Sequence, residues 1–233
     1  MGFKCLQSGS SGNCFTLFDE QTRILIECGI PYKKLLQGIG FNLSQYEGCI
    51  LTHEHADHSH TVKDIMKAGI NCYMSHGTAQ ALDISGYRVK TIEALKPFNI
   101  GTYKVMAFDV NHDAAQPFGY VIKSTVTKES LVFITDSYYV SNQFKNVDYF
   151  AIESNYITEH FMQSSTAPEL KKRLFTSHMS LENSIKFLQA QDLSKCKKIY
   201  LTHISKTNGD GEIMRREVMK ATGKETIICG KED

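Results

Sequence analysis

The chain has 233 residues, 42% of them hydrophobic, and its 26 lysines and arginines nearly balance 25 aspartates and glutamates. This size and composition support a full hydrophobic core, and we expect one domain over residues 1–233. No polybasic tail is present, so a nucleic acid would have to bind to a local patch of charge. No apolar run approaches the roughly 20 residues of a membrane span, and no secretory signal is visible, so we expect a cytoplasmic protein without a membrane partner. Nothing in the sequence identifies a protein partner.

The seven cysteines contain no CxxC pair, and most lie in apolar, strand-like runs. They are Cys5, Cys14, Cys28, Cys49, Cys72, Cys196 and Cys229. Their odd number and their placement predict buried free thiols in a reducing compartment instead of a disulfide framework.

In the first half of the chain, short apolar runs bounded by turn residues predict strands at residues 3–6, 14–18, 23–28, 48–52 and 71–74. The second and third of these strands are joined by Asp19-Glu20-Gln21-Thr22, which predicts a hairpin turn. Helices are expected at residues 32–37, 61–68 and 78–84, the second of them from the helical spacing of Val62, Ile65 and Met66.

In the second half of the chain, strands are expected at residues 104–110, 119–124, 131–135 and 149–152. A helix at 181–190, a strand at 197–202, a helix at 212–221 and a strand at 226–229 follow. Because strands and helices are mixed in two similar halves, we predict an α/β (α+β) protein, an αββα four-layer sandwich with two sheets packed face to face. A doubly wound parallel sheet is the alternative, which the early hairpins disfavour.

A cluster of three histidines and two acidic residues, His53-Glu54-His55-Ala56-Asp57-His58, directly follows the apolar run at residues 49–52. Imidazole nitrogen and carboxylate oxygen are the ligands that Zn²⁺, Mn²⁺ and Fe prefer when no thiolate takes part. His53 and His55 are two residues apart on an extended segment, so they point the same way and can bind one ion. Asp57 and His58 lie past the turn and can face a second ion. The cluster therefore predicts a metal site.

Further metal-type ligands follow other strand-like runs. Residues 106–110 lead to His112, residues 131–135 to Asp136, residues 173–176 to His178 and residues 197–202 to His203. A lone histidine after a strand is usually a loop residue. Four repeats of the pattern, in a chain that already carries the cluster, favour a shared site.

The order HxHxDH, then distant His, Asp and His, resembles the metallo-β-lactamase superfamily. The likeness is greatest to its YycJ/WalJ-like branch of phosphodiesterases and nucleases, which has ribonuclease Z-like relatives. The motifs that carry it are Ser8-Gly9-Ser10-Ser11-Gly12-Asn13, Asn111-His112-Asp113-Ala114-Ala115, Thr135-Asp136-Ser137, Ile152-Glu153-Ser154-Asn155, His178-Met179-Ser180 and His203-Ile204-Ser205-Lys206. The resemblance implies the metallo-β-lactamase sandwich over the whole chain.

The resemblance also implies a site for two divalent metal ions, Zn or Mn, with Fe as a further option. Its ligands would be His53, His55 and His112 at one ion, Asp57, His58 and His203 at the other, and Asp136 between the two. Such a site supplies a metal-bridging hydroxide for attack on the substrate, and Asp57 would have a catalytic role in orienting it.

His178 is the second residue for which we expect a catalytic role. It lies just before a helix that Ser180 can cap, and a histidine beside a helix N-terminus is well placed to meet a phosphate. In ribonuclease Z-like relatives the corresponding histidine contacts the scissile phosphate and is a candidate proton donor to the leaving oxygen. The alternative is a polar residue of a capping turn. Glu27 stands where relatives commonly have an aspartate that supports a ligand histidine, so its role is left open.

Together these features predict a dinuclear metal-dependent phosphodiesterase. The favoured activity is that of a DNA exonuclease, with DNA favoured over RNA. The alternative enzyme would hydrolyse a cyclic phosphodiester, thioester or lactone with the same metal site. A third alternative is a catalytically silent binding protein, which would be expected to have lost ligands, whereas all seven are present. The physiological metal and the polarity of cleavage do not follow from the sequence.

Overall fold

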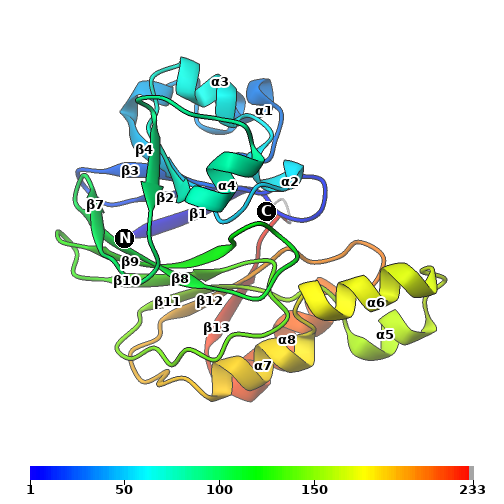
Figure 1. Cartoon of the computed structure of the whole chain (residues 1–233). Coiled ribbons are helices and arrows are strands. Elements are labelled where there is room, and N and C mark those ends of the chain that lie inside the picture. The colour runs from blue at the N-terminus through cyan, green and yellow to red at the C-terminus, as the bar shows by residue number, and fades with distance from the viewer. Residues whose placement is uncertain (231–233) are drawn as a thin grey trace. The chain divides into compact units, whose positions relative to one another are not determined.

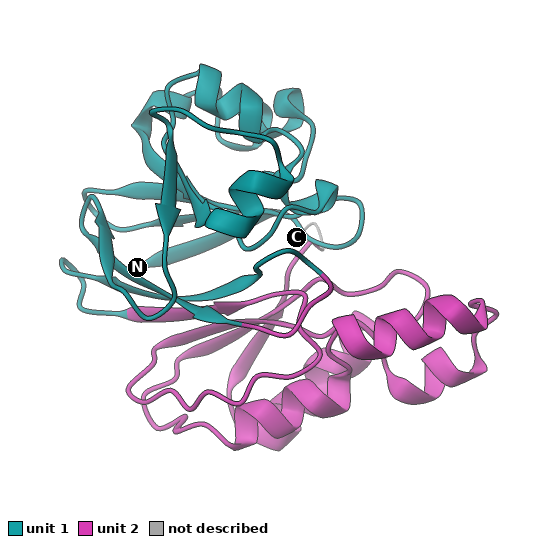
Figure 2. Ribbon diagram, in the orientation of Figure 1, with its two compact units in different colours: residues 1–109, 114–129 teal, residues 110–113, 130–233 magenta. Residues whose placement is uncertain are grey.

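The computed structural model describes residues 1–230, which fall into two compact units (Figure 2). Unit 1 comprises Met1–Asp109 and Ala114–Glu129, and unit 2 comprises Val110–Asp113 and the chain from Ser130 onward. The expectation of one domain over the whole chain stays a prediction. No helix of the described chain is both long and apolar enough to cross a membrane.

Unit 1 contains a six-stranded sheet in the order β1-β2-β3-β4-β5-β6 (Figure 1). Its strands are β1 (Gly2–Gln7), β2 (Cys14–Phe18), β3 (Arg23–Ile26), β4 (Tyr46–Ile50), β5 (Cys72–Ser75) and β6 (Val89–Ile92). The first three strands are antiparallel, and β3 to β6 are parallel. The predicted hairpin turn is confirmed, because Asp19 N donates to Thr22 O at 3.0 Å between β2 and β3.

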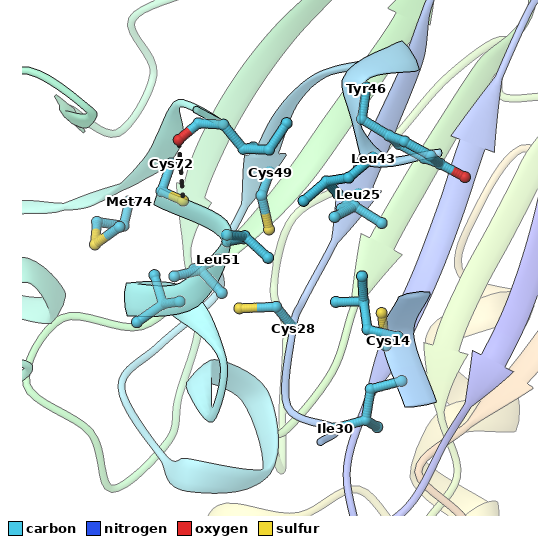
Figure 3. Close-up of a cluster of buried hydrophobic side chains, with 14 of the residues drawn as sticks. Cys14, Leu25, Cys28, Ile30, Leu43, Tyr46, Cys49, Leu51, Cys72 and Met74 are labelled. Atoms are coloured by element: carbon cyan, nitrogen blue, oxygen red, sulfur yellow. Dashed lines mark hydrogen bonds between the residues drawn. The ribbon is translucent and has the colours of Figure 1, made fainter. Parts of the chain in front are cut away.

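The helices of unit 1 connect the parallel strands, as parallel pairing requires. They are α1 (Tyr32–Gly38), the 3-10 turn η1 (Leu43–Gln45), α2 (Ala56–Ser59), α3 (Val62–Lys67) and α4 (His76–Ala81). Leu35 of α1 and Ile65 of α3 are fully buried in one hydrophobic cluster with side chains of the sheet. Figure 3 shows part of this cluster, in which Cys28, Cys49 and Cys72 lie among leucines. All seven cysteines are free, as predicted.

Three further strands of unit 1 run antiparallel in the order β9-β8-β7. They are β7 (Phe98–Ile100), β8 (Tyr103–Asp109) and β9 (Phe118–Ser124). Asp19 links the β2–β3 turn to these strands, since its Oδ2 accepts hydrogen bonds from Thr102 Oγ1 (2.7 Å) and Ser124 Oγ (2.6 Å). The link fixes how β7 to β9 lie against the first sheet within unit 1.

Unit 2 contains four parallel strands in the order β13-β12-β11-β10. They are β10 (Ser130–Ile134), β11 (Tyr149–Glu153), β12 (Lys198–Thr202) and β13 (Glu225–Ile228), and the helices are α5 (Thr158–Gln163), α6 (Pro168–Ser177), α7 (Leu181–Gln189) and α8 (Gly211–Thr222). Helix α8 packs against α7 and β13. All residues of β10 are buried, which agrees with the continuous apolar runs typical of parallel strands.

Most predicted elements are present within a few residues of their expected bounds, but one prediction is wrong. Residues 173–176 were expected to form a strand and instead lie in α6. The short apolar pair Leu174-Phe175 stands among strong helix formers, and Pro168 at the first turn favours a helix start. Helices α2 and α5, the 3-10 turn η1 and strands β6 and β7 were not predicted.

Candidate metal centre

The HxHxDH segment of unit 1 follows β4 and turns into the short helix α2. Two neighbouring segments hold its main chain, because Asn13 N donates to Asp57 O (2.7 Å) and Cys28 N donates to His58 O (2.8 Å). Gly29 allows the chain after Cys28 to lie this close to the HxHxDH segment, since a Cβ at Gly29 would lie 1.7 Å from Asp57 O. The early motif at residues 8–13 is therefore part of the support of the histidine cluster.

His53 and His55 bring two ring nitrogens together, as the two-residue spacing predicts. His53 Nε2 lies 3.1 Å from His55 Nδ1, and Thr52 Oγ1 lies 2.9 Å from His53 Nδ1. Two nitrogens that bind one tetrahedral zinc at 2.0–2.1 Å are about 3.3 Å apart. The pair thus fits two ligands of a single ion, with Thr52 orienting the first ring.

His58 is fully buried and has polar groups on both sides of its ring. Its Nε2 lies 3.2 Å from Asn13 Nδ2, and its Nδ1 lies 3.4 Å from Glu27 Oε2. Glu27 is itself fully buried, and its Oε1 accepts a hydrogen bond from Thr52 N at 2.9 Å. Burial raises the pKa of Glu27 above its ordinary value, against the hydrogen bonding and charge of His58. The longer glutamate therefore comes within 3.4 Å of His58, one of the predicted ligands.

Unit 2 gathers a second set of donors at the carboxyl ends of its parallel strands, the usual place of a site in such sheets. Asp136 follows β10, Glu153 ends β11 and His203 follows β12. One ligand atom each of Asp136, Glu153, His178 and His203 lies within 4.8 Å of the others. His112 joins them, with Nε2 at 3.7 Å from Asp136 Oδ2 and Nδ1 at 2.9 Å from Ser177 O.

Glu153 contacts two histidines of this set and the main chain beside it. Its Oε2 accepts hydrogen bonds from Ser137 N (3.0 Å) and Met179 N (3.1 Å), and its Oε1 lies 2.6 Å from His178 Nδ1 and 3.3 Å from His203 Nδ1. The rings of His178 and His203 stack at 5.3 Å with 6° between their planes. A single buried carboxylate therefore orients both histidines and the chain after Asp136.

The pKa values of these groups follow their surroundings. Burial lowers the pKa of His112, and the charge of nearby Asp136 opposes this only in part. Burial also disfavours a charged His178, but the charge and hydrogen bond of Glu153 outweigh it and raise the pKa of His178. Burial raises the pKa of Glu153, yet the charge of His178 outweighs it, so the pKa of Glu153 is lowered.

Three of these residues have a left-handed backbone: Glu27 (φ 62°), Asp136 (φ 46°) and His203 (φ 52°). Such a conformation costs free energy in residues other than glycine, and it persists where the surrounding structure enforces it, often at functional sites. In each case it turns the chain at or just after the end of a strand. The side chain therefore points toward the donor set instead of following the alternating side-chain directions of the strand.

The donors fit a metal site by their chemistry. Within the described residues, both units offer imidazole nitrogens and carboxylate oxygens that are buried or half-buried, and no cysteine sulfur joins them. This set suits Zn²⁺, Mn²⁺ or Fe²⁺. Unit 1 groups the predicted ligands His53, His55, Asp57 and His58, and unit 2 groups His112, Asp136 and His203 with His178.

The orienting partners were largely missed from sequence. Thr52, the main-chain oxygen of Ser177 and the amide of Asn13 each contact a histidine of the site. Thr52 directly precedes His53 and Asn13 ends the motif at residues 8–13, which are weak signals. The Ser177 carbonyl gives no sequence signal at all, because every residue has one. Glu153 stands out in the sequence only as part of the motif Ile152-Glu153-Ser154-Asn155.

The fold and these donor sets define a class of protein. The Beta-lactamase superfamily domain matches residues 22–204, so the chain belongs to this superfamily, and the predicted metallo-β-lactamase fold, with two mixed sheets, is confirmed. Together with its His/Asp clusters, this makes the chain a metal-dependent hydrolase.

Named relatives cover nearly the whole chain. It is 33% identical over 249 residues to "Exodeoxyribonuclease WalJ" of Streptococcus pneumoniae serotype 2 (strain D39 / NCTC 7466). The aligned region covers 99% of this chain and 92% of the relative. It is 28% identical over 245 residues to "Exodeoxyribonuclease YycJ" of Bacillus anthracis, covering 98% and 92% of the two chains. The crystal structure of the metallo-β-lactamase fold protein YhfI from Bacillus subtilis superposes with a TM-score of 0.77 at 15% identity, over 99% of this chain and 96% of the other.

Proposed function

We propose that this protein is a dinuclear metal-dependent phosphodiesterase that removes nucleotides from an end of DNA. Relatives at 28–33% identity over almost the full chain are named exodeoxyribonucleases. The observation that carries the proposal is His178, which Glu153 holds at 2.6 Å beside the donors Asp136 and His203. A histidine at this place suits a phosphodiester substrate, whose leaving oxygen needs a proton.

The proposed ligands are those that the sequence predicted. His53, His55 and His112 would hold one ion, Asp57, His58 and His203 the other, and Asp136 would bind both. When bound, two such ions lower the pKa of water and neutralise charge that develops on a phosphoryl group. The Glu27 carboxylate near His58 Nδ1 and the Ser177 carbonyl near His112 Nδ1 fix ring orientation, a role that ligand histidines commonly require of their neighbours.

His178 has a proposed role of its own. Its Nδ1 faces Glu153, so Nε2 is the ring nitrogen left for the substrate. The residue lies two positions before Ser180, which caps α7 by accepting a hydrogen bond from Asn183 N at 3.2 Å. The positive end of α7 favours an anionic phosphate near this turn. His178 Nε2 would then donate a proton to the leaving oxygen, while Glu153 stabilises the charged ring before the transfer. Asp57 is proposed to orient the attacking water through its carboxylate.

The test is a comparison of substrate classes. Metal-depleted protein is supplied with Mn²⁺ or Zn²⁺ and given bis-p-nitrophenyl phosphate, end-labelled single- and double-stranded DNA, a thioester and a lactone. The proposal predicts metal-dependent cleavage of the phosphodiesters that is lost in His178→Ala and Asp57→Ala. Turnover of the thioester or lactone that survives His178→Ala, with both phosphodiesters intact, would instead identify a small-molecule hydrolase.

A further inference from the structure

A groove of unit 2 lies beside α7 and has no part in the site described above. The chain between β10 and β11 crosses from one parallel strand to the next over residues 135–148 without a helix, although helices usually make such crossovers. A cavity of about 410 Å³ lies between residues 138–143 of this connection and α7. We call it the α7 groove. Its volume is in the range of small-molecule sites in proteins.

The α7 groove begins next to the donor set of unit 2. On one side, Tyr138 is two residues after Asp136, and on the other Met179 directly follows His178. Two residues of chain span at most about 7 Å. The end of the groove near the donors is also well fixed, because Asn111 Nδ2 and Ser137 Oγ both donate to Tyr139 O, at 3.0 Å and 2.9 Å. A strand of substrate held at His178 would thus meet the groove within one nucleotide.

The side chains of the groove combine aromatic rings, amides and one cation. Tyr138 is 38% exposed and Tyr139 56% exposed, and Phe187 is buried, with its ring centroid 6.3 Å from that of Phe150 in β11. The cation is Lys186, which has no ion-pair partner among residues 1–230. None of the residues that line the groove is acidic.

Three of the four side-chain amides that line the groove are open to a ligand, whereas that of Gln191 bonds to the main chain of Phe144 and Phe187. Those of Asn142, Gln143 and Asn183 make no side-chain hydrogen bond with the described part of the chain. Rings that stack, amides that pair with base edges and a lysine that attracts phosphate are the three elements with which proteins bind single-stranded nucleic acid. A bound peptide would have no acidic partner here for its basic residues and no sheet edge with which its main chain could pair.

We propose that the α7 groove binds the nucleotide next to the cleaved phosphodiester of a DNA strand. Tyr138 and Tyr139 provide the stacking surface, the amides contact the edge of the base, and Lys186 attracts the flanking phosphate. This inference rests on the proposed function. It assigns to unit 2 both the proton donor and the site that sets the position of the strand.

The first experiment compares two substrates of different size. Single-stranded DNA fills the groove, whereas bis-p-nitrophenyl phosphate has no base. We expect Tyr139→Ala to lower the ratio of kcat/KM for DNA to that for bis-p-nitrophenyl phosphate about tenfold, and Tyr139→Phe to restore it, because a phenyl ring still stacks. Tyr87→Ala is the matched control, an exposed tyrosine of unit 1 that should leave the ratio unchanged.

The second experiment measures binding without catalysis. Metal-depleted protein is titrated into a fluorescent single-stranded oligonucleotide, and anisotropy gives the affinity at several salt concentrations. Lys186→Gln should reduce the slope of log affinity against log salt by about 0.7, the value for one phosphate contact of a single strand, whereas Lys220→Gln on α8 should not change it.

The outcomes separate the two claims. If the wild type cleaves DNA while Tyr139→Ala and Lys186→Gln behave like their controls, the groove inference is overturned and the proposed function stands. If the wild type cleaves neither phosphodiester, the proposed function fails and the groove inference fails with it.

Discussion

Glu153 Oε1 lies 2.6 Å from His178 Nδ1, and both side chains belong to unit 2. The same carboxylate accepts hydrogen bonds from the main chain after Asp136 and after His178. A single buried glutamate therefore couples the proposed proton donor to a proposed metal ligand. This coupling leads to the first prediction.

His178→Ala should lower kcat for bis-p-nitrophenyl phosphate about 10²- to 10⁴-fold, the range for loss of a general acid. Metal content per chain, measured by mass spectrometry of the purified protein, should stay at the wild-type value, because His178 is not one of the seven proposed ligands. A His178→Ala protein that loses one metal ion would make His178 a ligand, a role that its distance to Asp136 and His203 also permits.

Gly29→Ala should destabilise the protein by at least about 1–3 kcal/mol, the usual cost of overpacking. The added Cβ would meet Asp57 O at 1.7 Å and His58 N at 2.5 Å, so the HxHxDH segment has to move. Urea denaturation followed by circular dichroism measures the loss. Gly38→Ala is the control, since its Cβ would meet only the side-chain end of Leu6 at 3.2 Å. Equal midpoints for the two variants would contradict this account of Gly29.

Asp148 should contribute stability that depends on pH. Burial raises the pKa of its carboxyl group, but hydrogen bonds from Lys195, Ser130 N and Lys197 outweigh this and place the pKa below its ordinary value. A carboxyl group whose pKa is lowered by folding stabilises the fold above its unfolded pKa, about 3.9, and this contribution is lost as pH falls through the folded pKa.

The corresponding variant is Asp148→Asn. Because both lysines are half-exposed, we expect it to lower the free energy of unfolding by only about 1 kcal/mol at pH 7. The difference from the wild type should shrink as pH falls through the lowered pKa of Asp148, because the carboxyl group is then protonated in the folded protein too. A difference that stays constant as pH falls through the acid range until the protein unfolds would show that the lost interaction does not depend on the charge of Asp148.

Sequence reasoning found the strands of the site and its chemical donors because both depend on local patterns. Residues 131–134 are continuously apolar, and β10 (Ser130–Ile134) is buried on both faces. Helix α6 was not predicted, because the apolar pair Leu174-Phe175 before His178 suggests a strand. The helix signal is Pro168, which lies at the helix start. The strand expected to continue to Cys28 stops at Ile26, since Glu27 adopts a left-handed conformation that no residue pattern announces.

The supports of the site were harder to predict than its donors. Glu27 and Glu153 are fully buried, and their partners lie 16 or more residues away in sequence. Such contacts depend on the tertiary structure. The groove beside α7 has the same origin, because it exists only where a crossover without a helix passes a helix of a later segment.

The most direct test of the central claim is nucleotide release from 5′- and 3′-labelled DNA by the metal-depleted protein, before and after addition of Mn²⁺ or Zn²⁺, with bound metal counted in parallel. The account predicts no cleavage without metal, recovery as two ions bind per chain, and successive loss of nucleotides from one end. Full DNA cleavage by protein that retains no metal, or tight binding of two ions without cleavage of any phosphodiester, would contradict it.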